Sequence, residues 1–258
     1  MSYNSLSEKT VTPGQVLTLP PAEKTNTATQ PTESDIQKPV YEYNIPQLLD
    51  SFPQNFYLSG KPDKKVVALT FDDGPDRIFS PRILELLDKE NVKATFFLVG
   101  RQIKENPMFV SQLIAGGHQV AGHGWSHTNL RLKESNEVKE EIEKTSAAIK
   151  NVTGLEPLFI RPPYGELSDD AMKEIINLDY TAVNWSVDSL DWYSRSVDDI
   201  LTSTLKDTKR GSIILMHSTG GNLDATVKAL PELLNTLKAQ GYSFVTVSEL
   251  LDKKSYRQ

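Results

Sequence analysis

The chain has 258 residues, of which 38% are hydrophobic and 24% charged, with a formal net charge of -6 and no cysteine. This length and composition fit a soluble globular protein with one large α/β domain, or with a domain of about 200 residues and a tail. The negative charge argues against nucleic-acid binding, which depends on clustered Lys and Arg. The lack of cysteine excludes disulfides and thiol chemistry. No apolar run approaches the roughly 18 residues that a bilayer span needs, so no transmembrane segment is expected.

Residues 1–40 are rich in Thr, Pro, Ser, Gln and Lys, and their few apolar residues follow no period. Such a stretch buries too little apolar surface to offset its ordering entropy, so we predict a disordered or extended tether in which only residues 16–19 would dock. Its first residues do not form an export signal, and we expect any such signal to have been removed. An irregular lead-in over residues 41–65 and a tail over residues 253–258 would flank a domain spanning residues 66–252.

From residue 66 onward, short apolar segments alternate with helical ones, and seven of the apolar segments are predicted to be strands. These strands cover residues 66–71, 94–99, 119–121, 157–160, 181–185, 212–216 and 243–247. Each is short and mostly apolar, as expected of parallel strands that are covered on both faces. The alternation favours an α/β fold in the form of a distorted (β/α) barrel of about seven strands, although an open sheet would also fit.

Three of the helices between these strands have recognisable ends. Ser80 followed by Pro81 predicts an N-cap and the first helical residue after it. Apolar positions spaced by three and four over residues 138–152 predict an amphipathic helix that ends at Gly154. Ser168 is expected to cap a further helix whose first turn carries two aspartates, which suit the positive end of the helix.

The first predicted strand runs into the sequence TFDDGPD at residues 70–76. Neighbouring side chains on a regular strand point to opposite faces, but Gly74 and Pro75 force the strand to stop. Both Asp72 and Asp73 can then serve one site. Considered alone, the segment could equally be an ordinary Asp-Gly turn.

The four histidines differ in what they can do. His123 and His127 are four residues apart, which would place both imidazoles on one face if the segment turns helically. Two histidines together with one strand-terminal carboxylate form a three-ligand set with open positions, as in hydrolytic zinc sites. His118 is interpreted as a packed structural residue. His217 ends a predicted strand, where a structural and a catalytic role are equally open.

Two further loops follow predicted strands. Arg161 begins the sequence RPPYGE, in which Pro162 and Pro163 fix the backbone and would aim the amide of Tyr164. The other loop contains Asp191-Trp192, and it could also be only an acidic loop with one packed tryptophan.

Together these segments resemble the polysaccharide deacetylase family, which is carbohydrate esterase family 4 with its NodB homology domain. The matching segments occur in the family's order and cover about residues 62–252: TFDDGP at 70–75, His123 with His127, RPPYG at 161–165, Asp191-Trp192, and Leu215 with His217. The family's second motif usually has Ser or Thr after its first histidine, whereas this chain has Gly124.

The resemblance implies a divalent metal, with Zn²⁺ expected first and Co²⁺ or other ions as alternatives. Asp73, His123 and His127 would be its ligands. Asp72 would be the general base, and Arg161 would hold it ionised and oriented.

The resemblance also implies roles for the remaining loops. His217 would be the general acid, held in its charged form by Asp191, and the amide of Tyr164 would bind the oxyanion. The substrate pocket would be formed by Trp192, Leu215, Pro162, Pro163 and Tyr164.

The expected activity is removal of N-acetyl groups from N-acetylhexosamine polymers, with peptidoglycan or chitin-type chains as the polysaccharide partner. The alternatives are an O-deacetylase of the acetyl xylan esterase type and a binding module that has lost turnover. We expect an extracytoplasmic or cell-wall-associated monomer, because an extended tether suits a protein that works at a cell wall.

Overall fold

The computed structural model describes residues 45–61, 63–194 and 196–257. The predicted tether over residues 1–40, including residues 16–19, lies outside the described residues, and its boundary stays a prediction. The lead-in that was expected to be irregular contains helix α1 (Ile45–Ser51) and strand β1 (Phe56–Tyr57). Strand β1 is only two residues long and forms because it pairs with a distant strand, which no local pattern indicates.

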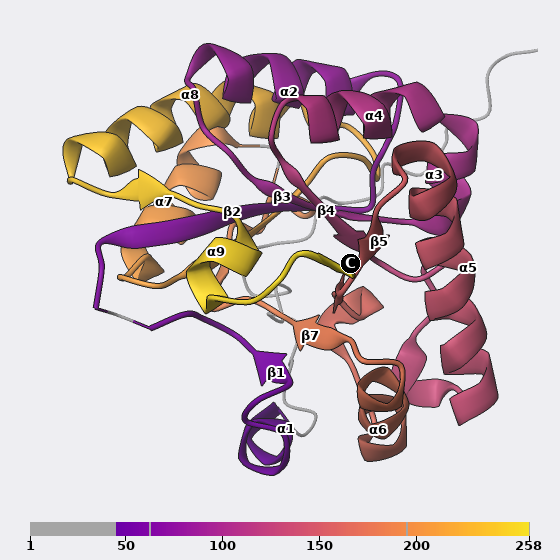
Figure 1. Cartoon of the computed structure of the whole chain (residues 1–258). Helices are drawn as coiled ribbons and strands as arrows, with labels where there is room; N and C mark the ends of the chain where they lie inside the picture. The colour runs from indigo at the N-terminus through magenta and orange to yellow at the C-terminus, as the bar shows by residue number, and fades with distance from the viewer. Residues whose placement is uncertain (1–44, 62, 195, 258) are drawn as a thin grey trace, which may run out of the picture. The chain divides into compact units, whose positions relative to one another are not determined.

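Among the described residues, nine strands form one sheet, and every strand pair in it is parallel. Eight strands follow one another in the order β1-β7-β6-β4-β3-β2-β9-β8, and β10 pairs with β2. Besides β1, these strands are β2 (Val66–Asp72), β3 (Thr95–Leu98), β4 (Gln119–Gly122), β6 (Phe159–Ile160), β7 (Thr181–Val183), β8 (Val187–Asp188), β9 (Ile213–His217) and β10 (Ser243–Phe244). The sheet curls into a partial barrel with helices on its outside, which confirms the predicted distorted (β/α) barrel (Figure 1).

The predicted strands differ from the observed ones at three places. The segment 157–160 is divided between β6 and β5 (Glu156–Pro157), because β5 pairs instead with β11 (Tyr256–Arg257) in a separate antiparallel ladder. The residues expected to be a tail therefore include a strand. The last predicted strand stops at Phe244, because Thr246 caps the next helix, α9 (Val247–Leu251). Strand β8 is two residues long, and the sequence did not predict it.

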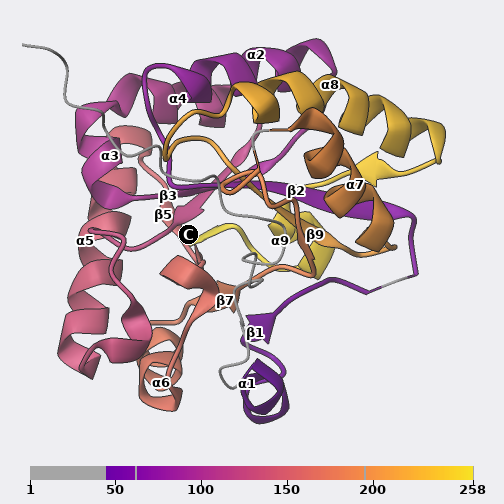
Figure 2. The ribbon, with the colours of Figure 1, turned by 180° about the vertical axis from the view of Figure 1, so that it is seen from behind.

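Helices cover the outside of the curled sheet, as the two opposite views show (Figures 1 and 2). Besides α1 and α9, they are α2 (Phe79–Lys89), α3 (Gly100–Glu105), α4 (Pro107–Ala115), α5 (Ser135–Thr153), α6 (Asp169–Asn177), α7 (Val197–Asp207) and α8 (Asp224–Ala239). Single 3-10 turns lie at Leu130–Leu132 and Pro163–Gly165. Within the part of the chain that the structure describes, no helix has the length and apolar character needed to cross a membrane.

Two of the three predicted helix ends are observed. Gly154 ends α5 in the left-handed conformation, with φ 72°, and the Ser168 hydroxyl accepts the amide of Ala171 at the start of α6. The predicted N-cap at Ser80 is wrong, because the Asp76 carboxylate already accepts the amides of residues 78, 79 and 80 at 3.1, 2.8 and 2.8 Å. The Ser80 hydroxyl instead donates to the carbonyl of Ser218.

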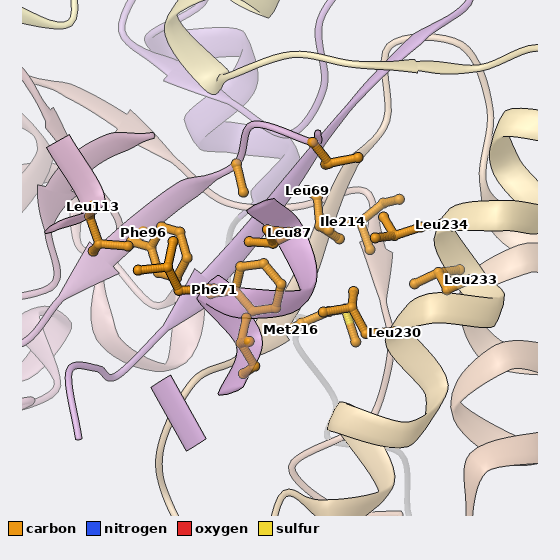
Figure 3. Packing of buried hydrophobic residues seen from close by; sticks show 14 of the residues in the cluster. Leu69, Phe71, Leu87, Phe96, Leu113, Ile214, Met216, Leu230, Leu233 and Leu234 are labelled. Atoms are coloured by element: carbon orange, nitrogen blue, oxygen red, sulfur yellow. The ribbon is translucent and has the colours of Figure 1, made fainter. Parts of the chain in front are cut away.

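The core between β2, β3, β9 and the helices α2, α4 and α8 fixes the strands that carry the site (Figure 3). This core consists of large, apolar and buried side chains, among them Leu69, Phe71, Leu87, Phe96, Leu113, Ile214, Met216, Leu230, Leu233 and Leu234. Full burial of one such side chain contributes about 1.5–3 kcal/mol. Strands β2 and β9 are therefore rigidly supported up to their carboxyl ends.

Candidate active site

The candidate site lies at the carboxyl ends of the parallel strands. Asp72 is the last residue of β2 and His217 the last residue of β9, and the two lie opposite each other in the register of these neighbouring strands. His123 follows β4 directly, and Arg161 follows β6. Because parallel strands end at the same edge of the sheet, four segments far apart in the sequence meet there. His118 lies at the other end of β4, where its buried Nδ1 accepts the amide of Ala94, as expected of a structural residue.

Two successive aspartates reach the same site because the backbone turns at the second of them. Asp73 has φ 72°, in the left-handed region that non-glycine residues rarely adopt. Gly74, which was predicted to help stop the strand, does not have a left-handed backbone, and a glycine is needed there for another reason. A Cβ atom there would lie 2.4 Å from the Ser218 hydroxyl, so the β2 and β9 loops can approach each other only at a glycine.

Three side chains converge as a possible metal centre. Nε2 of His123 and Nε2 of His127 lie 3.3 and 3.1 Å from Oδ1 of Asp73, and the three ligand atoms all fall within 4.8 Å of one another. The Nδ1–H of His123 donates to the carbonyl of Arg161 at 2.8 Å, which leaves the lone pair on Nε2 facing Asp73. Oδ1 of Asp73 is buried and has no hydrogen-bond partner among the described residues. An unsatisfied carboxylate oxygen beside two imidazole nitrogens fits a divalent cation.

The segment between the two histidines is a loop and not the helical turn that their spacing suggested. Gly124 and His127 have φ values of 72° and 59°, and these left-handed residues fold the loop back on itself. The imidazole rings consequently meet edge to face with their centroids 5.0 Å apart. The four-residue spacing places the rings together, but through tertiary support and not through helix geometry.

Arg161 is fully buried and holds Asp72. Its Nη1 donates to Oδ1 of Asp72 at 2.7 Å and to the hydroxyl of Thr70 at 2.8 Å. Nε and Nη2 donate to the carbonyls of Val183 and Asn184, and the guanidinium lies 4.1 Å from the centroid of the Phe97 ring. Oδ2 of Asp72 remains on the side of the metal ligands, 3.7 Å from Nε2 of His123.

The sequence did not predict most of these partners of Arg161. Thr70 could have been found, because it opens the TFDDGP motif on the same strand face as Asp72. The carbonyls of residues 183 and 184 could not, because any residue type offers a carbonyl.

His217 and Asp191 form a second buried pair. Oδ1 of Asp191 accepts Nδ1–H of His217 at 2.8 Å, while Oδ2 accepts the backbone amide of His217 and the hydroxyl of Thr226. Burial lowers the pKa of His217, but the charge and hydrogen bond of Asp191 outweigh it and raise this pKa to about 9. The imidazole is therefore charged at neutral pH, with Nε2 free to give up a proton. Thr226 was not singled out in the sequence.

The residues predicted to form the pocket lie on the same loops and strand as these groups. Tyr164 has φ 63°, its ring packs 4.8 Å from that of His127, and its turn is held by the side chain of Asn184 on the carbonyl of Gly165. Pro162 and Pro163 are buried in that turn, Leu215 is buried on β9 two residues before His217, and Trp192 is exposed next to Asp191. The Asn184 contact was missed by the sequence.

The sequence profile of the polysaccharide deacetylase family matches residues 59–183. A peptidoglycan-N-acetylglucosamine deacetylase of Bacillus cereus is 40% identical over 204 residues, which cover 79% of this chain and 74% of that protein. This chain belongs to the polysaccharide deacetylase family. The resemblance drawn from the motifs is thereby confirmed, and the chain is placed among deacetylase enzymes.

Solved structures of family members agree with this assignment. The peptidoglycan N-acetylglucosamine deacetylase Bc1960 superposes with a TM-score of 0.80 at 38% identity, over 83% of this chain and 100% of that one. An acetyl xylan esterase from Clostridium thermocellum, solved with a cobalt ion, superposes with a TM-score of 0.69 at 34% identity, over 72% of this chain and 90% of that one. The family therefore includes members that are named for amide and for ester substrates.

Proposed function

We propose that this polysaccharide deacetylase is a metal-dependent hydrolase that removes N-acetyl groups from N-acetylglucosamine in peptidoglycan. The observation that carries the proposal is the convergence of Asp73, His123 and His127 beside two separately held groups, Asp72 and His217. One carboxylate and one charged imidazole at the same site provide a base and an acid that do not neutralise each other.

The chain's own residues account for the first half of the reaction. A divalent ion held by Asp73, His123 and His127 would lower the pKa of a bound water toward about 7 and polarise the substrate carbonyl. Asp72 would take the proton from the attacking water through Oδ2, because Arg161 holds Oδ1. The backbone N–H of Tyr164 would donate to the oxyanion that forms on the carbonyl oxygen.

The second half needs an acid, because the amine of an amide is a poor leaving group until it is protonated. His217 would donate its Nε2 proton to the sugar nitrogen as the carbon–nitrogen bond breaks, giving acetate and a free amine. Asp191 stabilises the charged imidazole before this transfer. Trp192, Leu215 and the turn of Pro162 and Pro163 would enclose the acetyl group.

The substrate assignment is supported by the relatives named as peptidoglycan N-acetylglucosamine deacetylases. Chitin-type chains and O-acetylated xylan are the alternatives, the latter because of the acetyl xylan esterase relative. A peptidoglycan substrate implies an extracytoplasmic or cell-wall-associated protein. We also propose that the protein is a monomer. Acetate release should be greatest with peptidoglycan in a panel that also contains chitooligosaccharides and acetylated xylan. If acetate release were greatest with acetylated xylan, the proposed activity would be O-deacetylation and not N-deacetylation.

Removal of the metal is expected to abolish acetate release, and Zn²⁺ or Co²⁺ should restore it. Elemental analysis of the reconstituted protein should give one ion per chain, and Asp73→Asn should lower this occupancy because it removes the ligand charge. Asp170→Asn is a matched control, since Asp170 is exposed on α6 and its ion-pair partner among the described residues is Lys173. Full activity after exhaustive chelation would refute the metal mechanism.

The activity is also expected to fall at alkaline pH. Because the pKa of His217 is raised to about 9, the acid is present through neutral pH and is lost as the pH rises through that value. Asp191→Asn removes the charge that raises this pKa, so the alkaline limb of kcat/KM should move to lower pH. An unchanged limb in Asp191→Asn would show that another group controls it.

A further inference from the structure

We infer that Glu141 on α5 is a positioning residue that fixes the loop between His123 and His127 and thereby sets the affinity for the metal. The inference rests on the proposed metal site, and it concerns a residue that lies outside the family's recognised motifs in this chain. Glu141 is partly buried and lies 14 residues beyond His127. It acts through the loop and is not itself a ligand.

Glu141 accepts three hydrogen bonds from two residues of this loop, Trp125 and Ser126. Its Oε2 accepts the backbone amides of Trp125 at 2.7 Å and Ser126 at 2.9 Å, and its Oε1 accepts the hydroxyl of Ser126 at 2.7 Å. Hydrogen bonds to an ionised acceptor are roughly twice as strong as neutral ones. One carboxylate therefore holds the middle of the loop at three points.

The helix backbone at Glu141 is itself held in place. The residue after it, Ile142, is buried in the core, as is Thr145 on the next turn, whose hydroxyl donates to the Glu141 carbonyl at 2.7 Å. Helix α5 begins with a capping box of Glu134 and Glu137 and ends at Gly154 in the left-handed conformation, so both of its ends are stabilised. The three hydrogen bonds of Glu141 therefore attach the loop between His123 and His127 to a rigid helix of 19 residues.

Gly124 makes this arrangement possible. Its φ of 72° disfavours a side chain, and a Cβ atom would lie 3.2 Å from Oε2 of Glu141 and 3.6 Å from Cγ of Pro163. A larger residue would press on the carboxylate that holds the loop. The loop has no hydroxyl at position 124, but the hydroxyl of Ser126 supports it by donating to Glu141.

The other side of the loop is held by the first turn of α3. The amides of Gly100 and Arg101 donate to the carbonyls of Gly124 and Trp125 at 3.0 and 3.1 Å. These bonds do not depend on Glu141, so loss of its charge should loosen the loop without unfolding it. The expected consequence is a less well-placed His127, and disturbed supporting contacts typically lower metal affinity about 10–100-fold.

The test compares Glu141→Gln with Glu140→Gln. Glutamine has the same shape but only one acceptor oxygen, so it cannot satisfy donors on both sides of the carboxylate. Glu140 is exposed on the same helix and pairs with Lys144, which makes its substitution a control for a lost charge. Zn²⁺ affinity is measured by competition with a chromophoric chelator, and we expect a Kd about 10–100-fold higher in Glu141→Gln and unchanged in Glu140→Gln.

A second readout uses the metal-free protein. Hydrogen exchange at the amides of Trp125 and Ser126 should be faster in Glu141→Gln than in the wild type, whereas Glu140→Gln should match the wild type. A merely structural role for Glu141 would instead change exchange across α5 as a whole. Exchange that is unchanged at residues 125 and 126 would overturn the inference.

The outcomes separate this inference from the proposed function. If the wild type binds no divalent ion, the proposed function fails; if the wild type binds Zn²⁺ and Glu141→Gln binds it equally well, only the inference fails. Should Glu141→Gln not fold, Ser126→Ala removes one of the three bonds and is expected to raise the Kd about fivefold, the equivalent of about 1 kcal/mol. Wild-type affinity in Ser126→Ala would then count against the inference.

Discussion

Asp72→Asn is expected to reduce acetate release by roughly two to four orders of magnitude while the metal content stays at the wild-type level. The reason is that Asp72 is the base in the proposed mechanism, whereas Asp73 and the two histidines would form the ligand set. The asparagine oxygen can still accept the bond from Nη1 of Arg161, so the buried guanidinium keeps a partner. Acetate release, bound metal and melting temperature should be measured on the same preparation.

Thr70→Val is the matched control for this substitution. It removes the hydroxyl that shares Nη1 of Arg161 but leaves the carboxylate of Asp72 unchanged. Its loss of activity should be much smaller than that of Asp72→Asn if proton transfer is the function of Asp72. Wild-type turnover in Asp72→Asn would overturn the base assignment, whereas a wild-type protein that releases no acetate would favour a module that has lost turnover.

His217→Ala is expected to damage hydrolysis of an N-acetyl sugar far more than hydrolysis of an activated acetate ester. The amine leaves only when it is protonated, and a missing acid typically costs about 10²–10⁴-fold, whereas an activated ester releases its alcohol without help. The measurement is the ratio of the two losses in kcat/KM. A large ratio supports both the acid role of His217 and the amide as the substrate bond.

The control for His217→Ala is a substitution that keeps the imidazole but removes another hydrogen bond to Asp191, the carboxylate that holds this imidazole. Thr226→Val removes the other side-chain hydrogen bond to Asp191 and should lower both activities by a similar, small factor. If His217→Ala lowered the N-acetyl and ester activities equally, the general-acid role would be lost. The proposed metal site would not be contradicted by that result.

The parallel sheet could be predicted because its central strands are local apolar runs with clear ends. Strand β2 and helix α5 were recognisable from single stretches of sequence, since their side-chain periods and their terminal Asp and Gly residues are local signals. Strands β1, β8 and β11 were not, because each is two residues long and exists only through pairing with a distant strand. Strand pairing of this kind leaves no pattern in the short segment itself.

The candidate site divides along the same line. The sequence by itself determined which residue types are available at strand ends: two adjacent carboxylates, two histidines four apart, an arginine directly after a strand and a strand-terminal histidine. Only the tertiary structure decided how they are held, through the left-handed backbone at Asp73, the carbonyls around Arg161 and the hydrogen bonds from the histidine loop to Glu141. The physical reason is that chemical identity is carried by side chains in the sequence, whereas orientation comes from contacts between segments that meet only after the sheet has formed.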